Sequence, residues 1–113
     1  MASYEELALR FKALAHPVRL QILDLLRRGE VCVCHMETAL GRRQAYISQQ
    51  LMVLREAGLV EARKEGLQMY YRLTDEFTAG LLDTIFGEAP VQAQPRLADC
   101  SCPHCVAVAQ ETS

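Results

Sequence analysis

The chain lacks any apolar run that approaches the length of a membrane span, and its acidic N-terminus, residues 1–6, has no hydrophobic signal core. These absences argue against a membrane protein and against secretion, so we expect a cytoplasmic protein with no membrane partner. The chain also has no internal repeats. Its 113 residues, of which 50% are hydrophobic, are enough for one small globular domain and a tail. A helical domain of this size often gains stability by dimerising.

Cysteine is unevenly placed along the chain. The five cysteines fall in two short clusters: Cys32 and Cys34 in the first third of the chain, and Cys100, Cys102 and Cys105 near its end. In a reducing cytoplasm, cysteines serve in metal binding or redox chemistry more often than in structural disulfides, and an odd number fits that use. The two clusters therefore indicate a thiol-based sensor. The alternative is that Cys32 and Cys34 are small buried hydrophobic residues.

The chain has no overall excess of positive charge, because 12 basic residues are set against 14 acidic ones and the net charge is −2. Its distribution is uneven. Residues 1–41 carry five basic and five acidic groups, residues 42–72 carry six and three, and residues 73–113 carry one and six. A local excess of +3 in an otherwise neutral or acidic chain is the pattern expected of a nucleic-acid-binding segment.

The spacing of apolar residues predicts four helices, a β-hairpin and a fifth helix. The predicted helices cover residues 4–13, 17–28, 34–39, 43–57 and 75–87, and the predicted strands cover residues 59–64 and 67–73. Glu65 and Gly66 are expected to form the hairpin turn, Leu67 to lie on the half-buried side of the second strand, and Thr74 to cap the last helix. The fold class is therefore mainly α with a small β-hairpin, a winged helix-turn-helix in the order α-α-α-α-β-β-α. We expect residues 1–87 to form the DNA-binding and dimerisation domain and residues 88–113 a flexible, Cys-rich tail.

Five segments carry a resemblance to a known family. They are Phe11–Leu23, Cys32–Cys34, Ile47–Val60, Arg63–Gly66 and Tyr70–Leu73. In these segments the chain closely resembles the ArsR/SmtB family of metal- and metalloid-responsive repressors. The resemblance implies a homodimeric winged helix-turn-helix, with no enzymatic activity, that represses a resistance or efflux operon until an ion binds. We expect the first and last helices to form the dimer interface.

Two segments are expected to contact double-stranded operator DNA, namely the start of the recognition helix and the wing. The expected contacts are Arg43, Gln44, Ala45, Tyr46, Ser48 and Gln49 from the helix, and Arg63, Lys64 and Gly66 from the wing. Gln49 has the groups to read adenine, and Arg43, Arg63 and Lys64 suit phosphates. The family often has a serine at the cap of this helix, where this chain has Arg42 and Arg43.

The chemistry of the cysteine thiolates indicates which class of ion acts as the inducer. Thiolates prefer soft ions such as Zn(II), Cd(II) and Pb(II), and As(III) or Sb(III) is similar in preferring three thiolates. Residues i and i+2 do not face each other on a helix but share a side of an extended chain. Joint binding by Cys32 and Cys34 therefore predicts that this segment is extended or leaves the helix when the ion binds. In the family, a third nearby cysteine, or cysteines near the terminus of the other subunit, often complete such a pair; position 37 is a glutamate here. We therefore expect Cys100, Cys102 and Cys105 to complete the site.

Two other functions use the same thiols. A redox-switched repressor would form disulfides between them. A small dithiol oxidoreductase is indicated by Cys102-Pro103-His104-Cys105, but such a site normally opens a helix inside a βαβ unit, which this chain end does not provide. We expect His16 to be a cap or interface residue. The sequence leaves the identity of the ion open.

Overall fold

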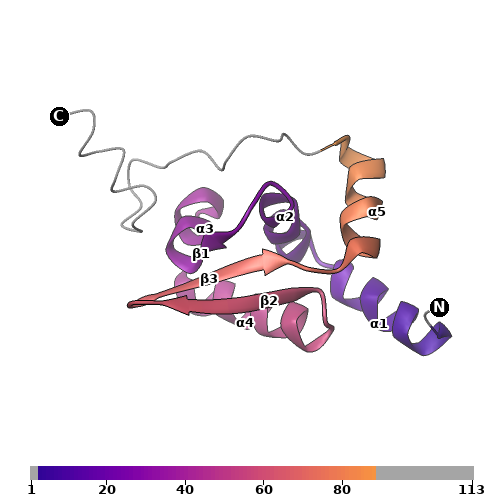
Figure 1. Ribbon diagram of the computed structural model, residues 1–113, viewed down its shortest axis with the longest axis horizontal. Coiled ribbons are helices and arrows are strands. Elements are labelled where there is room, and N and C mark those ends of the chain that lie inside the picture. Colours follow the sequence, from indigo (N-terminus) through magenta and orange to yellow (C-terminus); the bar gives the residue numbers. More distant parts are fainter. Residues whose placement is uncertain (1–2, 89–113) are drawn as a thin grey trace.

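The computed structural model describes residues 3–88, so all but the first residue of the tail predicted at 88–113, including Cys100, Cys102 and Cys105, lies outside the described residues. The elements in chain order are α1 (Tyr4–Leu14), α2 (Pro17–Leu26), β1 (Val31–Cys32), α3 (Val33–Leu40), α4 (Gln44–Glu56), β2 (Val60–Glu65), β3 (Gln68–Leu73) and α5 (Glu76–Phe86). The β2–β3 hairpin projects as a wing away from α1 and α5 (Figure 1). No helix within the described range is long and apolar enough to cross a membrane.

The predicted fold class is confirmed, with one added strand. The sheet has three antiparallel strands in the order β1-β3-β2. β1 pairs with β3 through Val31 opposite Tyr71 and Cys32 opposite Tyr70. A strand of two residues has no alternation to read, so the sequence pattern did not reveal it. Its consequence is that the first cysteine cluster begins inside the wing sheet.

The hairpin turn lies one residue later than predicted. Glu65 pairs with Gln68 across the hairpin, so the two turn residues are Gly66 and Leu67 rather than Glu65 and Gly66. Gly66 has a φ of +60°, which a glycine at the first turn position adopts without strain. The prediction that Leu67 is half-buried in the strand is wrong, because Leu67 sits at the turn and is 97% exposed.

The helix starts are held mainly by side-chain caps. His16 caps α2, as expected, since its Nδ1 accepts a hydrogen bond from the backbone N–H of Val18 at 3.2 Å. The cap predicted for α5 is wrong: Asp75, not Thr74, occupies that position, and its Oδ2 accepts a hydrogen bond from the backbone N–H of Thr78 at 3.0 Å. Thr74 instead donates its hydroxyl to the carbonyl of Leu59 at 3.5 Å. A carboxylate is the stronger acceptor at a helix N-terminus because it also suits the helix dipole.

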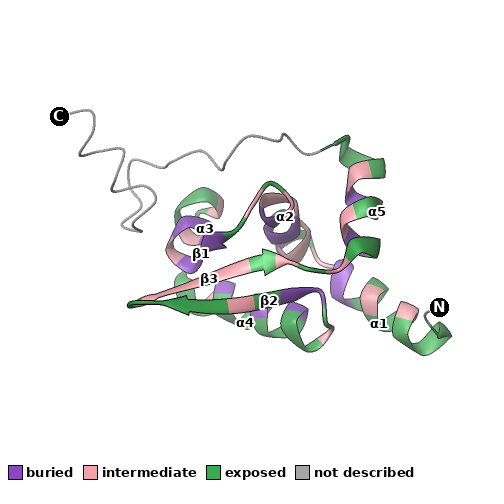
Figure 2. Ribbon diagram, in the orientation of Figure 1, coloured by how far each residue is buried: buried purple, intermediate pink, exposed green. Residues whose placement is uncertain are grey.

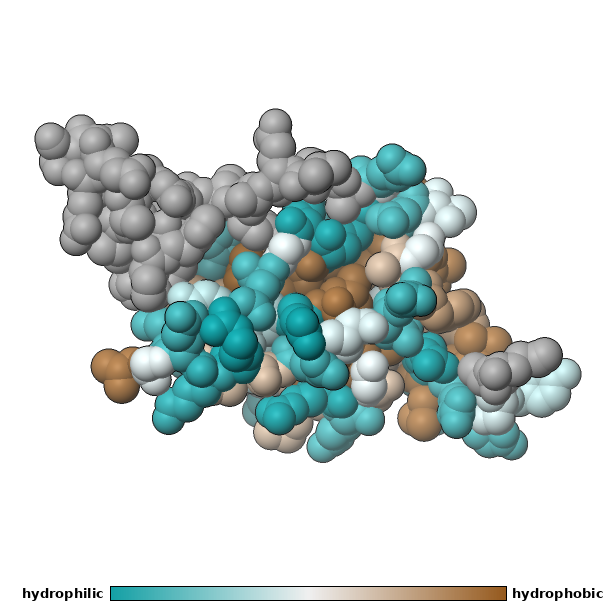
Figure 3. Space-filling model, viewed as in Figure 1, coloured by the Kyte–Doolittle hydropathy of each residue, from teal (hydrophilic) through white to brown (hydrophobic). Residues whose placement is uncertain are grey.

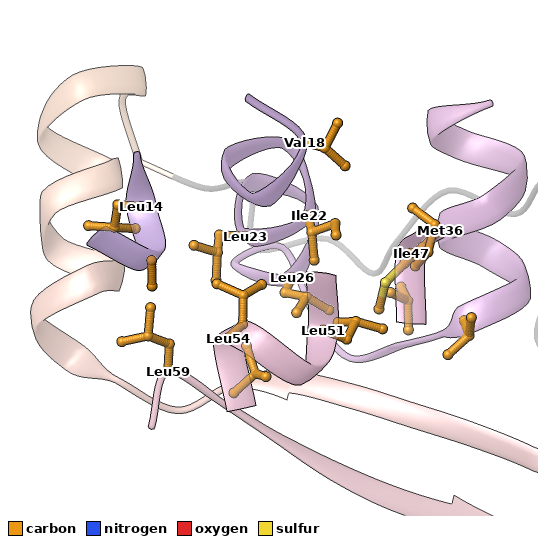
Figure 4. Packing of buried hydrophobic residues seen from close by; sticks show 14 of the residues in the cluster. Leu14, Val18, Ile22, Leu23, Leu26, Met36, Ile47, Leu51, Leu54 and Leu59 are labelled. Carbon is orange, nitrogen blue, oxygen red and sulfur yellow. The ribbon is translucent and has the colours of Figure 1, made fainter. Parts of the chain in front are cut away.

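One apolar core joins α2, α3, α4, the sheet and α5. Buried residues concentrate where these elements meet, whereas most of α1 is exposed (Figure 2). The largest fully buried apolar side chains are those of Ile22, Leu23, Met36, Ile47, Leu51, Leu54, Leu59 and Leu82. Figure 4 shows the α4 residues of this set pointing towards α2 and α3. The core thus fixes which face of α4 remains outside.

Arg27, the residue that ends α2, ties this helix to α5. Its Nη1 donates to Asp83 Oδ1 at 2.7 Å and to the carbonyl of Gly87 at 2.6 Å, and its Nε donates to Asp24 Oδ1 at 2.6 Å. The side chain of Arg27 is only 5% exposed. The hydrogen bond with Asp24 raises the pKa of Arg27, so the guanidinium stays charged.

We expect Arg27→Met to lower the free energy of unfolding by about 2 kcal/mol, because three charge-assisted or carbonyl hydrogen bonds are lost while the carboxylates remain partly solvated. Chemical denaturation at fixed protein concentration measures this change. Arg28→Met is the matched control, since Arg28 is exposed and its loss should cost less than about 0.5 kcal/mol. Equal costs for the two variants would show that the α2–α5 bridge does not stabilise the domain.

Candidate DNA-binding face and thiol pair

The α3–α4 unit presents one polar face of α4 to solvent. α3 ends at Gly41, whose φ of +63° closes the helix, and α4 begins two residues after Arg42. The inner face of α4 is buried through Ile47, Gln50, Leu51 and Leu54. The predicted DNA contacts Gln44, Ala45, Ser48 and Gln49 are all exposed. They therefore lie on the side of α4 that a DNA groove can reach.

Tyr46 differs from its neighbours because it is only half-exposed. Its hydroxyl lies 3.5 Å from His16 Nε2, so it contacts the start of α2. The guanidinium of Arg42 lies over its ring at 5.7 Å from the centroid. Arg43 occupies the cap position of α4 and makes no side-chain cap hydrogen bond. The start of α4 is thus flanked by two arginines, which is a favourable setting for a phosphate.

The wing carries Arg63, Lys64 and Gly66, which are all exposed. Arg63 makes contacts within the protein. Its Nε donates to Glu30 Oε2 at 3.3 Å, its Nη1 donates to Glu65 Oε2 at 2.9 Å, and its guanidinium lies 4.8 Å from the ring centroid of Tyr70. Arg63 lowers the pKa of Glu30 through the hydrogen bond, so this carboxylate stays charged through mild acid. Sequence reasoning missed Glu30 because it is 33 residues from Arg63 along the chain.

We expect Glu30→Gln to tighten DNA binding by about threefold, because it removes one of the two carboxylates that compete with phosphate for Arg63. Titration of a labelled duplex at fixed salt measures the change. Glu61→Gln is the matched control: it removes the same charge from a residue of β2, but Glu61 pairs with Arg72 at 2.9 Å instead. An equal gain in both variants would mean that net charge alone, and not release of Arg63, sets the affinity.

Cys32 and Cys34 lie side by side at the start of α3. Cys32 is the cap residue, with φ −84° and ψ 164°, and its Sγ accepts a hydrogen bond from the backbone N–H of His35 at 3.4 Å. Cys34 is the second residue of the helix, and the two Sγ atoms are 2.7 Å apart. Cys32 is 1% exposed, whereas Cys34 is partly exposed. The Cys32 thiol therefore lies at the edge of the core, whereas the Cys34 thiol is partly accessible to solvent.

This geometry corrects the expectation that the pair needs a fully extended segment or a distorted helix. A cap residue has extended backbone dihedrals, and its side chain folds back over the first turn of the helix. The cap position therefore brings the side chain of Cys32 next to that of Cys34, which already belongs to the helix. The predicted helix begins at residue 34, whereas the observed helix begins at Val33, which makes Cys32 its cap residue.

The donor set of this site is two thiols within residues 3–88. No group of three or more His, Cys, Asp or Glu side chains suited to a metal ion occurs in this range. Two adjacent thiols fit a soft ion in chemistry but leave its preferred number of ligands incomplete. A third side chain contacts this thiol pair. Gln68, the first residue of β3, accepts a hydrogen bond at its Oε1 from Cys34 Sγ at 3.5 Å. No sequence pattern marks Gln68, because contacts between distant segments follow only from the sheet register.

An apolar surface lies on α1 and α5, at the opposite end from the wing. Phe11 and Phe77 make an edge-to-face contact at 6.0 Å, and Arg10 pairs with Asp75 at 3.3 Å. The large apolar side chains exposed on these two helices are Tyr4, Leu9, Phe11, Phe77, Ile85 and Phe86. Figure 3 shows apolar side chains gathered over this end, whereas the surface over the wing strands is mostly hydrophilic. A patch of this composition is typical of a protein interface.

Comparison with known proteins gives consistent matches. The sequence pattern of the family described as "Bacterial regulatory protein, arsR family" matches residues 16–62. A biofilm growth-associated repressor from Agrobacterium fabrum (strain C58) is 44% identical over 81 residues, which cover 72% of this chain and 69% of that protein. The arsenical resistance operon repressor of Escherichia coli (strain K12) is 47% identical over 70 residues, 61% of this chain and 60% of that protein. A homodimeric winged helix-turn-helix DNA-binding domain from Mycobacterium bovis superimposes with a TM-score of 0.67 at 44% identity, covering 72% of this chain and 75% of that structure.

Proposed function

This chain belongs to the arsR family of bacterial regulatory proteins, and we propose that it is a homodimeric repressor that releases operator DNA when a thiophilic ion binds its cysteines. Its relatives are DNA-binding transcriptional regulators rather than enzymes. The observation that carries the sensing half of the proposal is the 2.7 Å separation of the Cys32 and Cys34 sulfurs at the start of α3.

The DNA-binding half is supported by the exposed face of α4. This face carries Gln44, Ser48 and Gln49, the arginines at positions 42 and 43 flank the helix start, and the wing adds Lys64. Side chains near the start of a recognition helix are those that reach base edges, while cationic groups around it contact phosphates. Ala45 and Tyr46 complete the helix surface, and Gly66 lets the wing turn approach the backbone.

The dimer is supported by the exposed apolar surface on α1 and α5. The similar domain from Mycobacterium bovis is described as homodimeric. We assign the α1–α5 surface, with Phe11, Phe77 and Ile85, as the interface in this chain. Two copies joined there would place two recognition helices on one DNA duplex, as symmetric operators require.

The inducer is proposed from the donor set. Cys32 and Cys34 would bind an ion of the class Cd(II), Pb(II), Zn(II), As(III) or Sb(III), and Cys100, Cys102 and Cys105 would supply the remaining thiolates. The bound ion would join these sulfurs to one another through metal–sulfur bonds. Cys32 Sγ accepts the hydrogen bond that caps α3, so an ion that draws this sulfur away from the His35 N–H would weaken the first turn of α3. α3 directly precedes the recognition helix α4 in the chain and packs against it. One similar protein is named an arsenical resistance operon repressor.

A second function is favoured by the same distance. Two sulfurs at 2.7 Å are close enough for an oxidant to join them, which would make the protein a redox-switched repressor. The oxidoreductase alternative, by contrast, rests on Cys102 and Cys105, outside the described residues, and nothing in residues 3–88 supports it.

The test starts from a duplex selected from a random DNA pool by the reduced, full-length protein. Anaerobic titration of that complex with each of the five ions, and separately with an oxidant in the presence of chelator, distinguishes the two functions. We expect at least one of the ions, added in stoichiometric amount, to release the protein from the duplex. Release by oxidant alone would replace it with the redox function, and replacing Cys100, Cys102 and Cys105 by serine should weaken ion binding if the tail completes the site.

A further inference from the structure

The segment that carries the thiols is joined to the wing at three points. Cys32 is opposite Tyr70 in the β1–β3 pairing. Glu30, two residues earlier, bonds to Arg63 of β2, and the Arg63 guanidinium lies over the Tyr70 ring. Cys34, two residues later, donates its Sγ–H to Gln68 Oε1 at 3.5 Å. The sensor segment is thus part of the wing structure as well as the start of α3.

Among these contacts, the one between Cys34 and Gln68 depends directly on the state of a sulfur. Gln68 is the residue that follows the wing turn, Gly66 and Leu67, and it pairs with Glu65 across the hairpin. Any bond that the Cys34 sulfur forms to a metal ion, to another sulfur or to carbon removes the S–H that Gln68 accepts. The backbone contacts of β1 do not change in this direct way.

We propose that Gln68 is a positioning residue of the thiol site, which holds Cys34 against the start of β3 and transmits bond formation at this sulfur to the wing tip. This inference rests on the proposed sensing role of Cys34. It adds a second route to DNA, since the first acts through the cap of α3 and the recognition helix. Loss of the contact loosens the end of the wing, where Lys64 of β2 and Gly66 of the turn would lie near the DNA backbone.

A double-mutant cycle in the full-length reduced protein tests the contact. Cys34→Ala removes the donor and Gln68→Met removes the acceptor at nearly constant length, whereas Cys34→Ser keeps a donor and Gln68→Glu keeps an acceptor oxygen. Hydrogen exchange of the backbone amides in β2 and β3 is measured, with the amides of α5 as internal reference. We expect Cys34→Ala and Gln68→Met each to speed exchange near the turn by about two- to tenfold.

The double variant should exchange no faster than either single variant, because one contact is removed in all three. The two conservative variants should stay close to the wild-type rate, a rescue that a purely structural role for either side chain would not produce. Additive effects of the single variants, or no effect of Cys34→Ala, would overturn the proposal.

The cycle needs no ion, so it remains decisive if the proposed inducer is wrong. A second measurement adds the link to function: the ratio of DNA affinities without and with Cd(II) alone, in wild type and in Gln68→Met. Using a ratio cancels any effect of the substitution on DNA binding itself. A smaller ratio in Gln68→Met supports transmission through the wing, and an unchanged ratio contradicts it. A wild-type protein that does not respond to Cd(II) counts against Cd(II) as the inducer, and the exchange cycle then decides the contact.

Discussion

Replacing Leu51 by alanine is expected to lower the free energy of unfolding by about 3 kcal/mol. Leu51 is fully buried in the middle of α4, among the side chains shown in Figure 4. The substitution removes three carbon atoms from a close-packed core and leaves a cavity that the surrounding helices fill only in part. Urea denaturation followed by circular dichroism measures the loss, at one protein concentration because a dimer's stability depends on it.

The neighbouring residue provides the matched control. Met52 is 62% exposed, on the outer face of the same helix, and Met52→Ala should cost less than about 1 kcal/mol. The contrast tests the assignment of inner and outer faces on which the DNA-binding surface depends. Similar losses for the two variants would mean that α4 is rotated from the orientation described, and that Ser48 and Gln49 do not face solvent.

Replacing Cys32 and Cys34 together by serine is expected to weaken the binding of Cd(II) by more than about 100-fold, because two soft ligands are lost from one site. Titration of the reduced protein, followed by the thiolate-to-metal absorbance band, measures the change. Serine also caps a helix, so α3 should remain formed. Comparing Cys32→Ser with Cys32→Ala separates the two roles of that residue, since serine removes the thiol but keeps the cap of α3, whereas alanine removes both.

A retained absorbance band of full intensity in the double serine variant would contradict the assignment and place the ion on Cys100, Cys102 and Cys105 alone. A lower melting temperature in Cys32→Ala than in Cys32→Ser would confirm that the Cys32 sulfur also caps α3. These two results are independent, because the first reports ligands and the second reports helix stability.

Apolar periodicity was sufficient to predict the long elements. The helix around Ile47, Leu51 and Leu54 was placed within a residue of its observed bounds, because three buried side chains on one face leave little freedom. Local features, such as the exact turn residues and very short strands, were less predictable. The hairpin turn shifted by one residue to Gly66 and Leu67, since Glu65 and Gln68 pair across it. The strand at Val31 and Cys32 is too short to leave a pattern.

The candidate site was likewise predictable only in part. The thiol pair was visible in the sequence, because two cysteines at one place are chemically distinctive. Its geometry was not, since a helix boundary between Cys32 and Cys34 sets their relative position. Glu30 and Gln68 gave no signal, because their partners Arg63 and Cys34 are more than thirty residues away along the chain. Contacts of that kind come from the three-stranded sheet, and the sequence predicted only two of its strands.

The central claim is that bond formation at the Cys32 and Cys34 sulfurs lowers affinity for operator DNA. It is tested most directly by the fluorescence anisotropy of a labelled operator duplex with the reduced full-length protein, without and with Cd(II), at fixed salt. We predict that Cd(II) weakens binding by about 5- to 150-fold in wild type and by less than about twofold in the variant with serine at positions 32 and 34. An equal loss of affinity in both proteins would contradict the claim.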